Sequence, residues 1–310
     1  MKKVLIADDD PQIRKVLTRT FSGPNWQVLE AEDGEKTINC VKQNYPDLII
    51  LDINMPKVGG KEVLGLIRKD IRTMMIPVIV ITGYDSMLGK INGLEMGADD
   101  YINKPFNINE ILWKANNLIQ RQIMAMAANP LTGLPGAPLI EKAAAEKIKD
   151  GKTFAFMYID IDNFKAYNDS YGYLKGDEAI KKTAEILKSL YDKYTNNYFA
   201  GHIGGDDFVV ISSLEQCEKI ADEIALRFDM AIKELYNQDD FKKGFIESLD
   251  REGKSKIFPL MRLSIAIVTN EKRTLSHYAK IIDIAFEIKK YLKSFKDRKG
   301  SLFLKDRRKD

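Results

Sequence analysis

The sequence predicts an α/β protein of two domains, the first of which is a doubly wound parallel sheet. The chain has 310 residues, which is enough for two domains that each bury a core. In residues 1–124, short apolar runs alternate with amphipathic stretches of helical spacing. A second part begins near residue 130, after a long helical pattern, and it carries acidic residues at the ends of apolar runs.

Composition and charge narrow the class of protein. Hydrophobic residues make up 45% of the chain and charged residues 30%, as in soluble globular proteins. No stretch has the roughly 18 apolar residues of a membrane span, so we expect no membrane partner and a cytoplasmic location. A net charge of +3 is too small to indicate a nucleic-acid partner. The two cysteines, Cys40 and Cys217, are expected to be buried free thiols.

The first domain is expected to contain five strands, over Val4–Ala7, Val28–Glu30, Leu48–Leu51, Val78–Ile81 and Asp100–Ile102. Ligands of a doubly wound sheet bind at the carboxyl ends of its strands. The polar residues at those ends are Asp8, Asp9, Asp52, Thr82 and Lys104. Three carboxylates can hold Mg²⁺, and Asp52 is placed to accept a phosphoryl group as a nucleophile. Lys104 and Thr82 can stabilise the charge that this phosphoryl group brings.

This pattern resembles the receiver domain of response regulators, whose five-stranded sheet is flavodoxin-like. The resemblance implies that Mg²⁺ is bound by Asp8, Asp9, Asp52 and the backbone carbonyl of Asn54. It makes Asp52 the phosphoacceptor and a sensor histidine kinase the phosphodonor. The implied switch residues are Thr82, Tyr101 and Lys104. Pro105 suits the cis Lys–Pro bond that such domains usually carry.

A helix is expected between the two domains. From Asn107 to Met126 the apolar residues recur at helical spacing, with neither Pro nor Gly before Pro130. We expect this helix to leave the first domain, residues 1–124, and to continue as a linker to about residue 129. Its distal part is either a plain linker or a surface that packs against a second copy of the chain.

The second domain, residues 130–310, has acidic residues at two strand ends. The apolar run Phe154–Ile159 is typical of a central strand buried on both faces, and it ends in Asp160. The pentapeptide Gly204–Phe208 reads Gly-Gly-Asp-Asp-Phe and lies between two apolar runs. It predicts a hairpin whose tight turn presents two adjacent carboxylates. Such acids can bind Mg²⁺ together with a triphosphate.

Polar residues between these motifs can read a base, because Asn168 and Asp177 can pair with its amino and imino hydrogens. The stretches LTGLPG, DIDNFKAYNDSYGYLKGDEAI and GGDDF, at 131–136, 160–180 and 204–208, resemble the GGDEF family of diguanylate cyclases. The resemblance covers roughly residues 130 to 310. It implies an α+β domain of the nucleotidyl-cyclase type, with a mainly antiparallel sheet and helices.

The resemblance also implies a reaction, in which two GTP condense to cyclic di-GMP and two pyrophosphates across a homodimer. The implied catalytic and Mg²⁺-binding residues are Asp160, Ile161 through its carbonyl, Asp206 and Asp207. Guanine would be read by Asn168 and Asp177, and the phosphates would contact Phe164, Lys165, Lys289 and Lys293. The expected function is a phosphorylation-regulated cyclase. Two alternatives are a catalytically weak domain that binds GTP and signals by contact, and a site that takes ATP in one half.

Several positions depart from the family pattern. Asp207 replaces the usual Glu, and His202 stands where Arg is frequent; we expect a hydrogen-bonded histidine rather than a ligand. Residues 195–198 replace the Arg-x-x-Asp of the product-inhibition site, so no inhibition through that site is expected. The long polar segment 237–259 is expected to be an inserted hairpin or loop, to which the sequence assigns no function.

Overall fold

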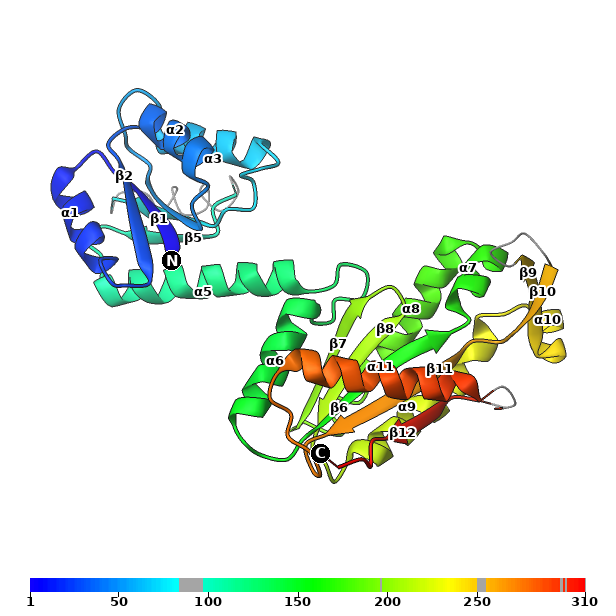
Figure 1. Cartoon of the computed structure of the whole chain (residues 1–310). Helices are drawn as coiled ribbons and strands as arrows, with labels where there is room; N and C mark the ends of the chain where they lie inside the picture. Colours follow the sequence, from blue (N-terminus) through cyan, green and yellow to red (C-terminus); the bar gives the residue numbers. More distant parts are fainter. Residues whose placement is uncertain (84–96, 196, 250–254, 296–297, 299, 310) are drawn as a thin grey trace. The chain divides into compact units, whose positions relative to one another are not determined.

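The computed structural model describes residues 1–83, 97–195, 197–249, 255–295, 298 and 300–309. The chain divides into two compact units, Met1–Ala125 and Met126–Asp310 (Figure 1). In the described part of the chain, no helix is both long enough and apolar enough to cross a membrane. Both cysteines are free; Cys217 is buried as predicted, whereas Cys40 is only half-buried.

The first unit is a five-stranded parallel sheet covered by helices. Its strands are β1 (Lys2–Ala7), β2 (Trp26–Ala31), β3 (Leu48–Asp52), β4 (Val78–Thr82) and β5 (Asp100–Asn103). Its described helices are α1 (Pro11–Thr20), α2 (Gly34–Asn44), α3 (Gly60–Lys69) and α5 (Ile108–Ala127). The strand order is β2-β1-β3-β4-β5, so the direction of winding reverses between β1 and β3. The predicted doubly wound fold and its five strands are confirmed.

Apolar side chains bury both faces of this sheet, which explains why its strands are nearly continuous apolar runs. Alternate residues of β1, β3 and β4 pack with α1 and α5 in one core, and the intervening residues pack with α2 and α3 in another. Asp10 and Asp33 begin α1 and α2, because each carboxylate accepts a hydrogen bond from a backbone N–H of the first turn.

The second unit contains a five-stranded mixed sheet in the order β12-β11-β6-β8-β7. Its strands are β6 (Ala155–Asp162), β7 (Tyr198–Gly204), β8 (Asp207–Ser212), β11 (Arg262–Thr269) and β12 (Leu302–Lys305). All pairings are antiparallel except that of β11 with β12, so the predicted mainly antiparallel sheet is confirmed. Strand β6 is buried along its whole length and lies in the middle of the sheet, as its apolar run predicts.

Helices cover both faces of the second sheet (Figure 1). They are α6 (Ala137–Lys149), α7 (Phe164–Tyr171), α8 (Tyr173–Lys188), α9 (Cys217–Ala231) and α11 (Tyr278–Ser294), with a 3-10 turn over Ile232–Glu234. A further helix, α10 (Gln238–Lys243), lies apart from this sheet and contacts β9. Helices α6 and α11 share one core with the sheet, and α7, α8 and α9 share the other. The turn between β7 and β8 and the end of β6 therefore lie at one edge, between two helical layers.

The polar segment 237–259 forms more than the expected hairpin or loop. It begins with helix α10 and continues as β9 (Phe245–Leu249) and β10 (Ser255–Pro259), which pair with each other in a separate two-stranded sheet. Residues 250–254, between the two strands, lie outside the described residues. Asn237 begins the helix by accepting a hydrogen bond from the backbone N–H of Asp240.

Glu223 on α9 is the centre of an ion-pair network that supports the second unit. Its carboxylate lies 2.6 Å from the ammonium of Lys193 and 2.6 Å from the guanidinium of Arg227, and it accepts a hydrogen bond of 2.9 Å from Tyr194. Burial alone would raise the pKa of Glu223, but these hydrogen bonds outweigh burial and lower its pKa to about 2. We expect Glu223→Gln to lower the free energy of unfolding at pH 7 by about 1–2 kcal/mol, allowing for solvent screening.

The sign of the pH dependence follows from the lowered pKa. The contribution of Glu223 is fully present above its ordinary value of 4.5, and it is lost as the pH falls through about 2. The difference between the wild type and Glu223→Gln should therefore shrink between these pH values in urea titrations. Glu215→Gln, at an exposed acid, is the control. A difference that stayed constant down to pH 2 would show that the ion pairs contribute nothing.

Candidate functional site

Three acidic residues gather at the carboxyl edge of the first sheet. Asp8 and Asp9 follow β1, and Asp52 ends β3, so all three lie where the winding of the sheet reverses. One carboxylate oxygen from each lies within 4.8 Å of the others. Asp8 and Asp52 are buried and Asp9 is exposed. Three carboxylate oxygens at this separation match the ligand set of a divalent metal ion such as Mg²⁺.

Lys104 neutralises the two buried acids of this group. Its ammonium lies 2.7 Å from Asp8 and 2.8 Å from Asp52. Burial raises the pKa of Asp8, and the hydrogen bond from Lys104 partly offsets that rise. Burial would lower the pKa of Lys104, but its hydrogen bonds to Asp52 and Asp8 outweigh burial and raise it. Lys104 therefore remains charged beside the carboxylate that the sequence predicts to be the phosphoacceptor.

The loop after β3 is fitted closely to Asp52. The backbone N–H of Asn54 donates to the Asp52 carboxylate over 3.3 Å. A Cβ atom on Gly60 would lie 2.0 Å from the Asp52 carbonyl oxygen, so only glycine allows α3 to start this close. Thr82 and Tyr101 lie at the end of β4 and in β5, and Lys104–Pro105 is a cis peptide bond, as expected.

In the second unit, the register of the sheet brings two of the predicted acids together. Asp160 near the end of β6 pairs with Asp207 at the start of β8. Asp206, in the turn, accepts a backbone hydrogen bond from Ile161 through its carbonyl oxygen, at 3.2 Å. Burial raises the pKa values of the Asp206 and Asp207 carboxyls, and the neighbouring Asp160 raises both further. The structure therefore concentrates negative charge at this edge of the sheet.

Two lysines of helix α11 reach the same acids. Lys289 lies 3.0 Å from Asp160 and 3.4 Å from Asp207, and Lys293 lies 2.5 Å from the other oxygen of Asp160. The spacing of four residues places both lysines on one side of the helix, as the sequence predicts. In this structure they contact the carboxylates themselves. The sequence could not show this pairing, because the partners are about 130 residues apart.

The predicted base-reading residues lie on the helices over the other face of the sheet. Asn168 is on α7 and Asp177 is on α8. The side-chain oxygen of Asn168 is buried and has no hydrogen-bond partner among the described residues. Gly176 makes room for it, because a Cβ atom there would lie 1.8 Å from that oxygen. A buried acceptor without a donor is costly, so this oxygen is suited to receive a hydrogen bond from a ligand.

The predicted phosphate-binding backbone lies at the start of α7. Asn163 adopts a left-handed conformation, with φ of 62°, which Asn tolerates better than most residues. Phe164 and Lys165 follow as the first helical residues, and no side chain of Asn163 caps their N–H groups. Backbone N–H groups at a helix start, preceded by such a bend, are a favourable site for an anion.

Asp162 is an acid that the sequence analysis did not separate from its neighbours. Its carboxylate accepts hydrogen bonds from the Ser264 hydroxyl at 2.9 and 3.0 Å and forms an ion pair with Arg298. Arg262 lies 3.7 Å away. Alternation along β6 puts Asp160 and Asp162 on the same face, and Lys293 lies 3.5 Å from Asp162 as well as contacting Asp160. Asp162 thus connects β6 to β11 and to the residues after α11.

His202 connects the stretch 131–136 to the turn that carries Asp206. Its side chain is 1% exposed, and its ring stacks on Phe208 with centroids 4.3 Å apart. Nε2 lies 2.9 Å from the Gly205 carbonyl and must donate to it, so in the neutral ring Nδ1 accepts from the Thr132 hydroxyl at 3.2 Å. Burial lowers the pKa of His202, which keeps the ring neutral near pH 7. The structure places His202 as a hydrogen-bonded core residue.

We expect His202→Ala to lower the free energy of unfolding by about 2–4 kcal/mol, because it leaves a cavity and removes two hydrogen bonds. His202→Gln, which keeps a donor near Gly205, should lose less. Urea denaturation of the full chain measures both. The chain's other histidine, His277, is exposed, and His277→Ala serves as the control. Equal stabilities of the two alanine variants would contradict the structural role of His202.

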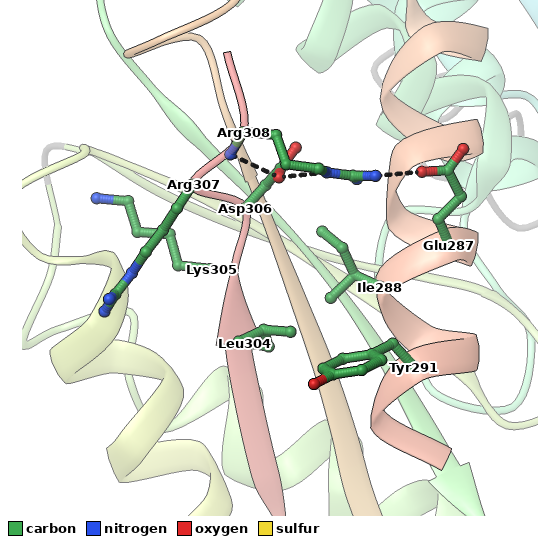
Figure 2. A pocket seen from close by; sticks show the side chains of 8 residues that line it. All are labelled: Glu287, Ile288, Tyr291, Leu304, Lys305, Asp306, Arg307 and Arg308. Carbon is green, nitrogen blue, oxygen red and sulfur yellow. Dashed lines mark hydrogen bonds and ion pairs between the residues drawn. The ribbon is translucent and has the colours of Figure 1, made fainter. Parts of the chain in front are cut away.

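A separate cavity of about 390 Å³ lies between α11 and the end of the chain. Figure 2 shows its lining, which includes Ile288, Tyr291 and Leu304. Arg308 crosses one end of it, 2.8 Å from Asp306 and 2.6 Å from Glu287 (Figure 2). The charged groups that cross the cavity pair with one another, and none of the acids or lysines predicted for the site lines it.

One expected feature is only partly covered by the structure. The segment 195–198, where we expect no product-inhibition site, includes Asn196, which lies outside the described residues. Tyr198 begins β7 and its hydroxyl donates to the Leu187 carbonyl at 2.8 Å. The expectation about product inhibition therefore stays a prediction.

Comparisons with protein families match each unit separately. Residues 4–116 match the family model described as the response regulator receiver domain. Residues 127–248 match the model described as the diguanylate cyclase, GGDEF domain. The second match stops within β9, although the main sheet continues with β11 and β12 further along the chain.

Curated relatives match part of the chain. A probable transcriptional regulator ycf27 of Porphyridium aerugineum is 31% identical over 195 residues, 62% of this chain and 71% of that protein. Its namesake in Guillardia theta is 40% identical over 54% of this chain, and the chain covers 59% of its length. Histidine kinase P4 of Formosa agariphila is 37% identical over 40% of the chain, and only 9% of that protein is covered.

Solved structures also match part of the chain. The receiver domain of the Francisella response regulator 1452 is 36% identical and covers 39% of this chain and 98% of its own, with a TM-score of 0.37. The chemotaxis response regulator CheY4 of Vibrio cholerae is 30% identical. The match covers 38% of this chain and 98% of that protein's chain, with a TM-score of 0.36.

Proposed function

Because the chain belongs to the response regulators and joins a receiver domain to a GGDEF domain, we propose that it is a diguanylate cyclase controlled by phosphorylation. The reaction joins two GTP molecules into cyclic di-GMP and releases two pyrophosphates. The observation that carries this proposal is the edge of the second sheet, where Asp160, Asp206 and Asp207 meet the two lysines of α11. Carboxylates for a metal and ammonium groups for phosphates are what a nucleoside triphosphate needs.

In the proposed reaction, Asp160, Asp206 and the carbonyl of Ile161 hold Mg²⁺, and Asp207 supplies a further carboxylate. A bound Mg²⁺ would neutralise the triphosphate and favour loss of the proton from the attacking 3′-hydroxyl. Lys289 and Lys293 can exchange their carboxylate contacts for phosphate oxygens when GTP arrives. The N–H groups of Phe164 and Lys165 bind phosphate oxygens at the start of α7.

Guanine is read by the helices on the other face of the sheet. The unpaired oxygen of Asn168 accepts a hydrogen bond from the base, and the Asp177 carboxylate accepts from the imino N1–H of guanine. Adenine has no hydrogen at N1, so Asp177 favours GTP over ATP. One domain holds one GTP, and the two hydroxyl attacks require two domains that face each other. We therefore propose a homodimer as the active form.

Regulation begins in the receiver domain. A sensor histidine kinase donates a phosphoryl group to Asp52, with Mg²⁺ held by Asp8, Asp9, Asp52 and the Asn54 carbonyl. Lys104, which contacts Asp52 already, then pairs with the phosphoryl oxygens. Thr82 and Tyr101 change position in response, as switch residues. The change favours the dimer in which two GTP sites face each other.

The test is nucleotide turnover by the full chain. The protein is incubated with GTP and Mg²⁺, with and without beryllofluoride as a mimic of the phosphoryl group, and the products are separated by chromatography. We expect cyclic di-GMP, formed faster in the presence of beryllofluoride. GTP that binds but stays unchanged in both states would overturn the enzyme and leave a domain that binds GTP and signals by contact.

A further inference from the structure

Helix α10 and strand β9, which have no role in the proposed function, contact helix α7. Figure 1 shows α10, β9 and β10 beside α7 at one end of the second unit. Ile246 of β9 is 2% exposed and belongs to the same core as Phe164 and Tyr167 of α7. The hydroxyl of Ser170 also donates to the Glu247 carbonyl, at 3.5 Å. The segment that α10, β9 and β10 form is therefore attached to the body of the domain through α7.

Three tyrosines form the contact between α7 and the chain that enters this segment. The rings of Tyr167 and Tyr171, both on α7, are stacked with centroids 4.8 Å apart. Tyr236 meets both rings edge-on, at 5.0 and 5.5 Å. The Tyr167 hydroxyl donates to the Leu235 carbonyl at 2.6 Å, and the Tyr236 hydroxyl accepts from the N–H of Met261 at 2.9 Å. Each hydroxyl thus fixes a ring to backbone on one side of the segment.

Tyr171 makes the most direct link to the segment itself. Its hydroxyl donates to the Asp240 carboxylate at 2.5 Å and accepts from the backbone N–H of Asn237 at 3.4 Å. The Asn237 side chain donates to the same Asp240 oxygen at 2.9 Å. Burial raises the pKa of Tyr171 to about 12, and the bond to Asp240 adds to the rise. The Tyr171 hydroxyl therefore stays protonated near neutral pH and can donate to the Asp240 carboxylate.

Helix α7 is short. Its first part carries residues predicted to contact the nucleotide, and its end contacts Asp240 of α10. Its first turn provides the N–H groups of Phe164 and Lys165, its middle provides Asn168, and its end provides Tyr171. Tyr171 lies three residues after Asn168, which is less than one helical turn. A short helix held at its end by a charged hydrogen bond has little freedom to rotate or shift. The contact between Tyr171 and Asp240 therefore fixes where Asn168 and the helix start point.

We propose that α10 and the paired strands β9 and β10 form a brace that holds α7 in the orientation needed to bind the nucleotide. Tyr171 and Asp240 are its positioning residues, and they set the affinity for GTP without touching it. The identity of the nucleotide rests on the proposed function. The brace acts on binding, because α7 carries Asn168 and the backbone N–H groups at the helix start. The predicted metal-binding acids lie on β6, on β8 and in the turn before β8, and Lys289 and Lys293 lie on α11.

The experiment compares four variants of the full chain: Tyr171→Phe, Asp240→Ala, the double variant, and Tyr191→Phe as the control. Tyr171→Phe keeps the stacked ring and removes only the hydroxyl. Asp240→Ala keeps the backbone N–H of residue 240. The hydrogen bond from this N–H to the Asn237 side chain, which caps α10, is therefore preserved. Tyr191 loses a hydroxyl that contacts the backbone of Ala200, away from α7. Calorimetry with GTP and Mg²⁺ gives Kd, product analysis gives turnover, and hydrogen exchange reports on the amides of α7.

We expect each single change to raise the Kd for GTP by about three- to tenfold, the range of the net contribution of one typical hydrogen bond. The two residues share one contact, so their effects should not add. The Kd of the double variant should lie within about twofold of the Kd of the weaker-binding single variant. Turnover at saturating GTP should stay within about twofold of the wild type, and the amides of 164–171 should exchange faster. The control should show none of these changes.

The possible outcomes test the brace proposal and the cyclase proposal independently. If the double variant binds GTP with the wild-type Kd, the brace proposal is wrong. This holds even if the double variant melts at a lower temperature than the wild type, because loss of stability alone does not test the proposal. If the wild type binds GTP but makes no cyclic di-GMP, the cyclase proposal fails, and the comparison of Kd values still decides the brace. If the wild type binds no GTP at all, both proposals are overturned.

Discussion

An Asp206→Asn variant is expected to lose at least about a hundredfold in GTP turnover, equivalent to about 2.7 kcal/mol of transition-state stabilisation. Asp206 lies in the turn between β7 and β8, and its carbonyl is fixed by the N–H of Ile161 at the end of the central strand. Asparagine keeps the shape of the side chain and removes the charge that a metal ion needs. Chromatography of cyclic di-GMP formed at saturating GTP and Mg²⁺ gives the rate.

The control for this change is Asp192→Asn, because Asp192 is an exposed acid of the same domain. It should turn over GTP at the wild-type rate. Both variants should unfold at the wild-type urea concentration, since Asp206 has no ion-pair partner within the described part of the chain that the change would break. An Asp206→Asn variant that kept more than a tenth of the activity would remove this residue from the proposed metal site.

An Asp52→Asn variant is expected to lose all response of the cyclase to phosphorylation. Asp52 is the nucleophile of the proposed phosphoryl transfer, and an amide oxygen cannot form the acyl phosphate. Turnover of GTP should therefore be the same with and without beryllofluoride, at the level of the unactivated wild type. Lys104 keeps its contact of 2.7 Å with Asp8, so we expect the receiver domain to remain folded.

Two measurements complete this prediction. Incubation with radioactive acetyl phosphate should label the wild type and leave Asp52→Asn unlabelled, while Glu62→Gln, at an exposed acid of α3, should be labelled normally. Continued activation of Asp52→Asn by beryllofluoride would show that the cyclase is controlled from another site. Labelling of Asp52→Asn would place the phosphoacceptor at a different residue.

The fold was predictable from the sequence because each sheet leaves a local signal. Buried parallel strands such as β3 are continuous apolar runs, and the acids that end them lie next to those runs in the chain. The turn at Gly204 and Gly205 is also visible in the sequence. Both glycines adopt positive φ angles that other residues avoid, so the Gly-Gly pair itself is the signal. Asp8, Asp52 and Lys104 could therefore be placed at one edge before their contacts were seen.

Contacts between distant residues left no such signal. Neither the pairing of Lys289 with Asp160 nor the ion pair of Arg298 with Asp162 is visible in residue spacing. The segment 237–259 was expected to be a hairpin or loop because its composition is polar, and helix α10 was missed because it is only six residues long. Nothing in the sequence marks Tyr167, Tyr171 and Tyr236 as a cluster, because Tyr236 is more than 60 residues from the other two.

The lysines of α11 have a consequence for the resting state of the GGDEF domain. Asp160 is buried, and a buried carboxylate without an opposite charge is costly. Lys289 and Lys293 act as built-in counterions, so the acid edge is partly balanced before any divalent cation arrives. In the proposed reaction, Mg²⁺ and GTP would therefore have to displace these lysines from Asp160.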